Sequence, residues 1–346
     1  MLATPAMRWN GEDQANAFAA AGPVPLPLGA AGPFDRPAWF DRLAAMHFPG
    51  QARVDAQGAA AGCGAWLPLV VHRPGQLISL ANWYSFVHRP QFVGGRAPDA
   101  QAMALTDLFA GLRARAARLS LYPVPEVDGS HALVCRALRA AGWWVDAHPG
   151  GDSHWLDLDG LDHASWWEGR PGALRSTVAR KGKKGLVAID IVTRCDPDIW
   201  AAYEAIYAAS WKPEEGNPTL LRAFAEDEGR AGRIRLGLAT IDGAPVAAQF
   251  WTVENGCAFI HKLAHVEDSV KASPGTLLTA ALFRHVIASD RVRRVDFGTG
   301  NDRYKPDWMN RHSKLWRIEA FNPSRPAAWP RALNAMLTRW RNQKGK

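Results

Sequence analysis

The chain has 346 residues, of which 47% are hydrophobic and 21% are charged, and this composition is typical of a globular protein. The length is sufficient for two domains that each bury a core. No apolar run is long enough to cross a bilayer, and residues 1–14 lack the apolar block of a secretory signal. We therefore expect a cytoplasmic protein without a membrane-spanning segment.

The formal net charge of +8 favours an anionic partner, such as a phosphorylated cofactor, a nucleic acid or an anionic membrane face. Charge alone does not choose among these partners. The four cysteines, Cys63, Cys135, Cys195 and Cys257, form no CxxC pair and have no histidine nearby at metal-ligand spacing. We expect reduced thiols and no metal site.

The first half of the chain predicts a short flexible segment followed by a mixed α/β domain. Residues 1–37 include a stretch rich in proline and glycine, which is typical of an extended segment. Residues 38–150 alternate between helical and strand periodicity. The helices are expected at 38–47, 100–118 and 131–141, and the strands at 63–71, 76–82, 119–122 and 142–147.

Residues 151–325 predict a second α/β domain, with a mostly antiparallel sheet flanked by helices. Asp242-Gly243 and Asn255-Gly256 separate three strand patterns and are strong hairpin signals, so we expect an antiparallel meander. Strands are expected at 154–158, 187–193, 233–241, 245–254, 256–265, 292–297 and 314–321, and helices at 171–184, from 196, and at 218–228, 274–289 and 302–310.

Two basic segments accompany these domains. Residues 326–346 predict a basic amphipathic helix with Arg331, Arg339 and Arg341 beside Trp329, Leu333, Met336, Leu337 and Trp340. A second cluster, next to Trp166 and Trp167, consists of Arg175, Arg180, Lys181, Lys183 and Lys184. Such a cluster is either a solvated helix face or a surface for anionic lipid or RNA. The tryptophans favour a membrane rim, so we expect peripheral binding to the inner membrane.

A turn before the helix expected at 274–289 is the first candidate site. Ser273 and Pro274 suit the start of a helix, and Gly275 and Thr276 follow them. A helix N-terminus offers unpaired N–H donors and a partial positive charge to an anion. The alternative is an ordinary N-cap at Ser273 with no ligand.

The second candidate site is the segment Asp-Phe-Gly-Thr-Gly-Asn-Asp-Arg-Tyr-Lys at 296–305. Asp296, Asp302, Tyr304 and Lys305 follow the end of a strand, where ligands collect in open sheets. It is not a kinase motif, because no glycine-rich loop or catalytic-loop segment accompanies it. The alternative is that Asp296 caps the turn while the other residues only flank it.

Both turns and the element order over 187–321 resemble the GNAT acyltransferase superfamily, and in particular its CelD-like and Fem peptidyltransferase-like branch. The resemblance implies tandem GNAT-like domains, of which the first is degenerate. It also implies acyl-CoA as the donor substrate, with the CoA pyrophosphate bound at the first turn, although only one glycine of the family's turn is retained. The implied cofactor-binding residues are Lys271, Ser273, Gly275, Thr276 and Leu277.

The resemblance also suggests catalytic residues. Tyr304 is the candidate acid for the departing thiolate, and N-acylation needs a base close to the thioester, for which His261, His265 and Glu267 are candidates. On a regular strand His261 and His265 share a face while Lys262 points away. No third metal ligand has suitable spacing, so no metal is expected.

Substrate contacts are implied for three groups of residues. Trp211-Lys212 resembles a pair that lies near the acceptor cleft in the family, and Trp83 and Tyr84 of the first half could shape the same site. The second turn supplies Asp296, Asp302 and Lys305, of which Lys305 is expected to position an anionic or carbonyl group.

These features predict an acyl-CoA-dependent N-acyltransferase that acts on an amine. The tryptophans and basic clusters favour an amphiphilic acceptor, such as a sphingoid base in a ceramide-forming step, or an amino sugar of an envelope glycan or exopolysaccharide. One alternative is a Fem-like transferase that uses aminoacyl-tRNA. Another is a non-catalytic GNAT-like protein that binds a nucleotide or an anionic membrane as a regulator.

Overall fold

The computed structural model describes residues 32–94 and 97–330. The chain divides into two compact units, one formed by residues up to Gly151 and from Lys314, and the other by Asp152–Ser313. Residues 314–330 therefore group with the first unit, whereas the sequence assigned residues up to 325 to the second domain. Residues 1–31 of the expected N-terminal segment and 331–346 of the expected C-terminal helix lie outside the described residues.

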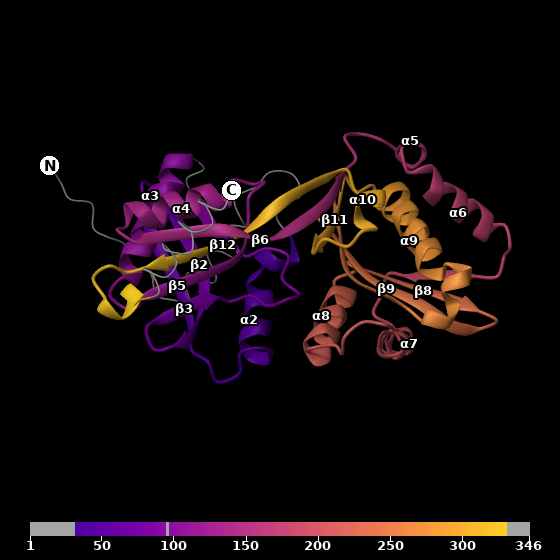
Figure 1. The fold of residues 1–346 in the computed structure, drawn as a ribbon, viewed down its shortest axis with the longest axis horizontal. Coiled ribbons are helices and arrows are strands. Elements are labelled where there is room, and N and C mark those ends of the chain that lie inside the picture. Colours follow the sequence, from indigo (N-terminus) through magenta and orange to yellow (C-terminus); the bar gives the residue numbers. More distant parts are fainter. Residues whose placement is uncertain (1–31, 95–96, 331–346) are drawn as a thin grey trace. The chain divides into compact units, whose positions relative to one another are not determined.

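Among the described residues, the first unit combines a mixed sheet with three α-helices and two short 3₁₀ segments, η1 (Pro33–Asp35) and η4 (Pro326–Ala328) (Figure 1). β1 pairs with β2, β2 with β3 and β5 with β12, all antiparallel, while β3 and β5 are parallel. The short β4 pairs with β2. The strands are β1 (Arg53–Ala60), β2 (Cys63–Arg73), β3 (Gln76–Ser79), β4 (Gln91–Gly94), β5 (Arg118–Pro125), β6 (Trp144–Asp157) and β12 (Arg311–Phe321), and the helices are α2 (Pro37–Met46), α3 (Pro98–Leu112) and α4 (Ser130–Ala140).

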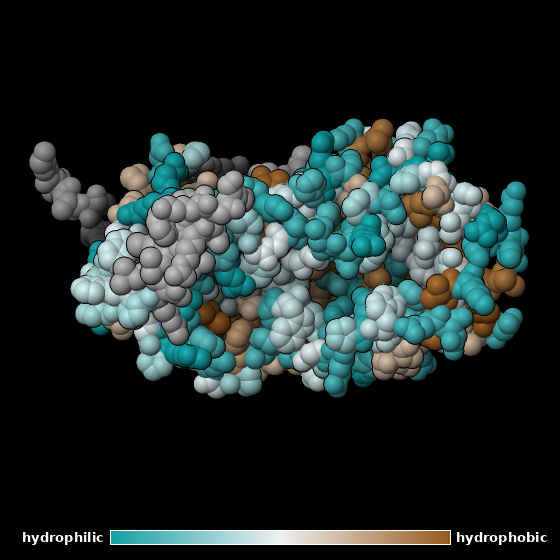
Figure 2. Space-filling view, in the orientation of Figure 1, coloured by the Kyte–Doolittle hydropathy of each residue, from teal (hydrophilic) through white to brown (hydrophobic). Residues whose placement is uncertain are grey.

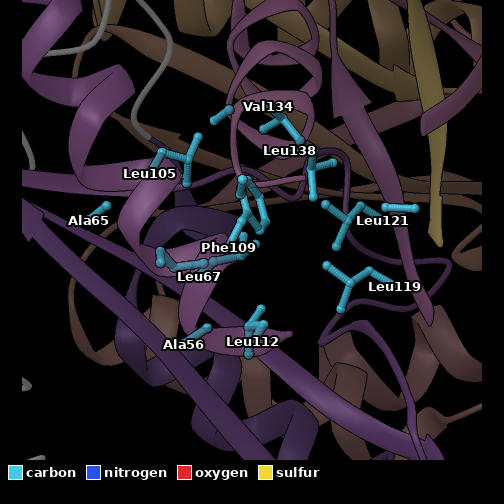
Figure 3. Packing of buried hydrophobic residues seen from close by; sticks show 14 of the residues in the cluster. Ala56, Ala65, Leu67, Leu105, Phe109, Leu112, Leu119, Leu121, Val134 and Leu138 are labelled. Atoms are coloured by element: carbon cyan, nitrogen blue, oxygen red, sulfur yellow. The ribbon is translucent and has the colours of Figure 1, made fainter. Parts of the chain in front are cut away.

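The core of this unit forms where α3 and α4 cover the sheet (Figure 3). Leu105, Phe109 and Leu112 recur at helical spacing on α3 and are buried against the strands. The closest approach is at Gly58 of β1, where a Cβ atom would overlap the backbone of Ala104 and Leu108. Glycine is therefore required for α3 to lie this close to the sheet.

The second unit is a sheet of order β6-β11-β10-β9-β8-β7 with helices on both faces. Its strands are β7 (Ala188–Val192), β8 (Ile234–Ile241), β9 (Ala244–Glu254), β10 (Cys257–His265) and β11 (Arg294–Thr299), together with the end of β6. Its helices are α5 (His163–Glu168), α6 (Gly172–Gly182), α7 (Pro197–Ala208), α8 (Pro218–Arg230), η2 (Glu267–Ala272), α9 (Pro274–Arg284), the π-helical continuation η3 (His285–Ser289) and α10 (Lys305–Trp308).

Alternate residues of the central strands reach opposite layers of this unit. Phe250 of β9 contacts Trp200 of α7 and Phe224 of α8. On the other face, Gly237 of β8 leaves room for Leu278 and Leu282 of α9. Figure 1 shows α7 and α8 on one side of these strands and α6 and α9 on the other.

The α/β fold class and the antiparallel meander are confirmed. The β8–β9 and β9–β10 pairs are antiparallel. Asp242 and Gly243 have φ of 51° and 80°, and Asn255 and Gly256 have φ of 50° and 75°, so both hairpins close through left-handed residues as their sequences predict. None of the helices among the described residues combines the length and apolar character that crossing a bilayer requires.

One boundary differs from the prediction. The strands expected at 142–147 and 154–158 are a single strand, β6, and the Gly150-Gly151 pair lies inside it. A Cβ atom at Gly150 would lie 2.7 Å from Tyr122 Cε2, and one at Gly151 would lie 2.9 Å from the Tyr122 hydroxyl. These glycines mark close packing against a tyrosine and not a turn. Strand β1 and helix α5 were also missed.

Close packing at Gly58 leads to a stability prediction. Gly58→Ala should lower the free energy of unfolding by about 1–3 kcal/mol, because the added methyl group forces the backbone of α3 away from β1. Gly111→Ala is the matched control, since Gly111 lies in α3 with open space around it and the change should stabilise the helix by about 0.5–1 kcal/mol. Urea denaturation measures both, and a Gly58→Ala protein as stable as the wild type would contradict the packing account.

Candidate functional site

The two central strands of the second unit separate at one end. β10 and β11 run parallel and pair from Cys257 with Arg294 to Phe259 with Asp296, and the described residues show no further pairs between them. A β-bulge interrupts β10 between Ile260 and Lys262. Strands that diverge in this way expose backbone groups and side chains at the edge of the sheet, where a ligand can reach them.

A cavity of ≈ 290 Å³ lies at this opening and contains residues of both predicted turns. Ser273, Gly275 and Thr276 line it from the start of α9, and Tyr304 lines it from the other turn. The remaining lining residues are Trp211, Gln249, Leu263, Ala264, His265, Val270, Pro274, Thr279 and Trp308. We call it the donor pocket. Lys271 lies beside it in η2, and Leu277 is buried in the first turn of α9.

The first turn of α9 is held against β9 by Gln249, which the sequence analysis missed. The Gln249 amide donates to Gly275 O (3.2 Å) and to Thr279 Oγ1 (2.7 Å) and accepts a hydrogen bond from Trp251 Nε1 (2.9 Å). Its signal is a glutamine within an apolar strand, where a buried polar group needs a partner. Ser273 is the N-cap residue of α9, as the alternative interpretation expects, but its φ is 57° and its side chain makes no capping hydrogen bond.

His265 faces the start of α9. A Cβ atom at Gly275 would lie 3.4 Å from His265 Nδ1, and the His265 ring lies 4.3 Å from that of Trp211. Burial lowers the pKa of His265, the nearby Lys212 charge lowers it further, and Glu267 at the start of η2 opposes this. A pKa below 6.5 leaves the imidazole neutral at neutral pH, so it can accept a proton.

His261 and His265 do not share a face, so that prediction is wrong. The bulge adds a residue to β10 and turns His261 and Lys262 toward α7 and α8 together. His261 Nε2 lies 2.8 Å from Thr252 Oγ1, and its ring packs on Phe250. This places His261 on the opposite side of the sheet from the start of α9.

Tyr304 lies at the edge of the donor pocket, 37% exposed, with its ring 5.6 Å from that of Phe297. Burial, reinforced by the Asp302 carboxylate, raises its pKa well above the usual range of tyrosine. The hydroxyl therefore keeps its proton at neutral pH and is available as a hydrogen-bond or proton donor.

Lys305 is buried and is hydrogen-bonded to backbone carbonyl groups. Its side chain is 3% exposed, and its ammonium group donates to the carbonyl oxygens of Phe297 (3.3 Å), Thr299 (2.6 Å) and Gly300 (3.4 Å). An ammonium has three N–H donors, so these three carbonyl oxygens can accept all of them. Asp302 Oδ2 lies 3.7 Å from Lys305 Nζ. The geometry therefore favours a lysine that holds the turn over the expected contact with substrate.

The two acidic residues of this turn have different environments. Asp296 accepts a hydrogen bond from Gly298 N (2.7 Å), which is the turn-capping alternative considered for it. Asp302 is exposed. Neither residue lines the donor pocket.

A second cavity, of ≈ 710 Å³, lies between α7, α8 and their connecting loop. We call it the aromatic pocket because Trp200, Tyr203 and Tyr207 line it. Lys212 lines it as well, directly after Trp211 of the donor pocket. The other lining residues are Glu204, Ala208, Pro213, Glu214, Glu215, Pro218, Thr219, Leu221 and Arg222.

Lys212 is unusual among the cations of this unit. Its Nζ lies 5.9 Å from the centres of the Tyr207 and Trp211 rings and forms no ion pair with another described residue. Burial lowers its pKa to about 8, helped by the charge of Lys262. Lys262 itself pairs with Glu215 at 2.8 Å. A pKa of about 8 leaves Lys212 mostly protonated at neutral pH, so it is a cation at the junction of the two pockets.

Three other residues that the sequence singled out belong to the first unit or to the core of the second. Trp83 and Tyr84 belong to the first unit, where Trp83 is 55% exposed with its ring 4.7 Å from that of His47, and Tyr84 is 6% exposed. Trp166 is 1% exposed and stacks on Phe283, so it belongs to the core and does not form the membrane rim that the sequence suggested.

Comparisons with known proteins agree with this architecture. Residues 169–306 match the acetyltransferase (GNAT) domain family. The crystal structure of FemX is 11% identical, with a TM-score of 0.62 over 92% of this chain and 98% of FemX. No curated protein matches the sequence.

Two further structures share the fold. One is the C-terminal DUF2156 domain of a protein described as a lysylphosphatidylglycerol synthetase from Agrobacterium fabrum, 14% identical, with a TM-score of 0.56 over 94% of this chain and 93% of that one. The other is L-PGS from Bacillus licheniformis, 12% identical, with a TM-score of 0.50 over 89% and 98%. Residues 169–306 therefore form a domain of the GNAT superfamily.

Proposed function

We propose that the protein is an acyl-CoA-dependent N-acyltransferase. The observation that carries this proposal is the donor pocket, which combines the N-terminus of α9, the neutral His265 and the protonated Tyr304 at the point where β10 and β11 separate. The N-terminus of α9 would bind the CoA pyrophosphate through backbone N–H groups. The candidate contacts are Lys271, Ser273, Gly275, Thr276 and Leu277.

The proposed reaction is direct attack of a neutral amine on the thioester carbonyl. The nitrogen forms the new C–N bond, and backbone N–H groups at the diverging strands stabilise the oxyanion. His265 accepts the proton that the nitrogen loses. When the C–S bond breaks, Tyr304 protonates the thiolate and regains its own proton through solvent. The products are an amide and free CoA.

The aromatic pocket is our candidate for the acceptor site. It adjoins the donor pocket through Trp211 and Lys212, and three aromatic side chains give it apolar walls. Such walls favour an amine that carries an apolar group, such as a sphingoid base, over a fully polar amine. An envelope amino sugar attached to a lipid would also combine an amine with an apolar group. Peripheral membrane binding would bring the enzyme to such a substrate.

A Fem-like transferase that uses aminoacyl-tRNA is the second candidate. It is favoured by the basic helix α6 and by the likeness in fold to FemX. The same pocket would then hold the aminoacyl end of an RNA.

Gly275→Trp should weaken CoA binding about a hundredfold, or roughly 2.7 kcal/mol, because the indole would fill the space between α9 and His265. Gly172→Trp is the matched control, since Gly172 has open space around it at the start of α6. Calorimetry with CoA measures both affinities. Unchanged affinity in a folded Gly275→Trp protein would exclude the donor pocket as the CoA site.

Tyr304→Phe should lower kcat about a hundredfold while the Kd of the acyl-CoA stays nearly unchanged, because only proton transfer to sulfur is removed. Tyr122→Phe, in the first unit, controls for loss of a tyrosine hydroxyl. Rapid-quench kinetics and calorimetry separate the two quantities. Lost binding with intact turnover would assign Tyr304 to donor binding instead of acid catalysis.

Protonation of His265 should cause the loss of activity at the acidic limb of the pH–activity profile. Activity falls as the pH drops through its pKa, since the protonated ring cannot accept a proton, and burial keeps this limb below pH 6.5. Lys212→Met removes a nearby positive charge and should therefore move the limb to higher pH. His265→Gln should abolish it. A limb that neither change alters would assign the titration to another group.

A further inference from the structure

Five cations gather beside the start of α9. Arg180 and Lys181 end helix α6, Lys183 and Lys184 follow directly, and Lys271 ends η2. Lys181 Nζ donates a hydrogen bond to Lys271 O, which joins the two segments. We call these residues the cationic cluster.

Four of the five cations, Arg180, Lys181, Lys183 and Lys184, have no acidic residue nearby in the sequence, whereas Lys271 follows Glu267 and Asp268 in η2. Residues 169–189 contain no aspartate or glutamate. None of the five side chains forms an ion pair among the described residues. Uncompensated cations at close spacing repel one another, and this cost is relieved when an anion binds.

Helix α6, which carries two of the five cations and leads directly into two more, contributes no buried side chain. No residue of α6 is fully buried, and only a half-buried stripe of Leu174, Thr177, Val178 and Lys181 lies against the unit. Lys181 ends that stripe, so the cations are held at one end of the helix near α9. In Figure 2, hydrophilic residues cover the surface where Figure 1 places the outer end of α6.

The cluster adjoins the opening of the donor pocket. Val270 and Ser273 line the pocket, and Lys271 lies between them in sequence. A cavity of ≈ 290 Å³ is at the small end of the range for ligand pockets, so we expect it to hold the thioester end of CoA while the nucleotide lies at its opening. The pyrophosphate can lie at the N-terminus of α9, which leaves the 3′-phosphate outside the pocket.

We propose that the cationic cluster binds the 3′-phosphate of CoA and thereby selects CoA over donors that lack this group. The inference rests on the proposed function, since it requires CoA in the donor pocket. A phosphate monoester is close to doubly charged at neutral pH and pairs well with several lysine and arginine side chains. The exposed Leu186 beside Lys184 would also suit an anionic bilayer, so vesicles are one arm of the test.

The test is calorimetry of the full chain with CoA, 3′-dephospho-CoA and pantetheine. The wild type should bind CoA at least about tenfold more tightly than 3′-dephospho-CoA, and the difference should shrink as salt rises. The combined change Lys181→Gln, Lys183→Gln and Lys184→Gln should remove the preference and leave the affinity for 3′-dephospho-CoA unchanged. Arginine at the same three positions should retain the preference.

A charge-matched control separates local contacts from net charge. Arg115, Arg136 and Arg139 are exposed cations of the first unit, and their combined change to glutamine removes the same number of positive charges. This variant should keep the preference for CoA. Loss of the preference in the control as well would overturn the proposal, because net charge would then explain it.

Three further outcomes of the binding measurements would overturn the inference. Equal affinity of the wild type for CoA and 3′-dephospho-CoA would overturn the inference while CoA binding itself still supports the proposed function. Failure of CoA, 3′-dephospho-CoA and pantetheine alike to bind would overturn both. If binding of mixed tRNA or of phosphatidylglycerol vesicles is lost in the lysine-to-glutamine variant while its preference for CoA is unchanged, the cluster belongs to that partner and the inference fails.

Discussion

The separation of β10 from β11 is the constraint on which the rest of the second unit depends. Two parallel strands that pair only from Cys257 to Phe259 leave an opening in the sheet, and no other element closes it among the described residues. Lys305 stabilises one side, since its ammonium donates to two carbonyl groups at the end of β11 and to one in the turn after it. Gln249 stabilises the other by fixing the first turn of α9. The buried ammonium of Lys305 and the buried amide of Gln249 thus fix the two sides of the pocket. The hydrogen-bonding groups of both side chains have partners.

The bulge between Ile260 and Lys262 of β10 separates two chemical environments. Beyond it, His265 faces α9 and the donor pocket, while His261 and Lys262 face α7 and α8. Lys212 lies where these environments meet, and its charge reaches both His265 and Lys262. The pKa of the proposed base therefore depends on a residue of the proposed acceptor pocket.

Local signals predicted most of the second unit, because its hairpins, helix starts and glycine turns are encoded within a few residues. The two turns of the site were found in this way and do line one pocket, except that Asp296 and Lys305 are used by the fold itself. Non-local features were missed. The bulge at His261 has no local signature, the role of Gln249 depends on a helix 26 residues away, and the Gly150-Gly151 pair resembles a turn until Tyr122 is placed beside it.

The order of the chain has a consequence for synthesis. The second unit lies between Gly151 and Lys314, both of which belong to the first, so the first unit is interrupted by it. Strand β12 pairs with β5 across nearly 200 residues, with Ser120 and Glu319 joined at 2.8 Å. A ribosome therefore completes the whole second unit before it makes the strand that completes the sheet of the first. The nascent first unit has an unpaired edge at β5 during that interval, and such an edge invites association between neighbouring chains on a polysome.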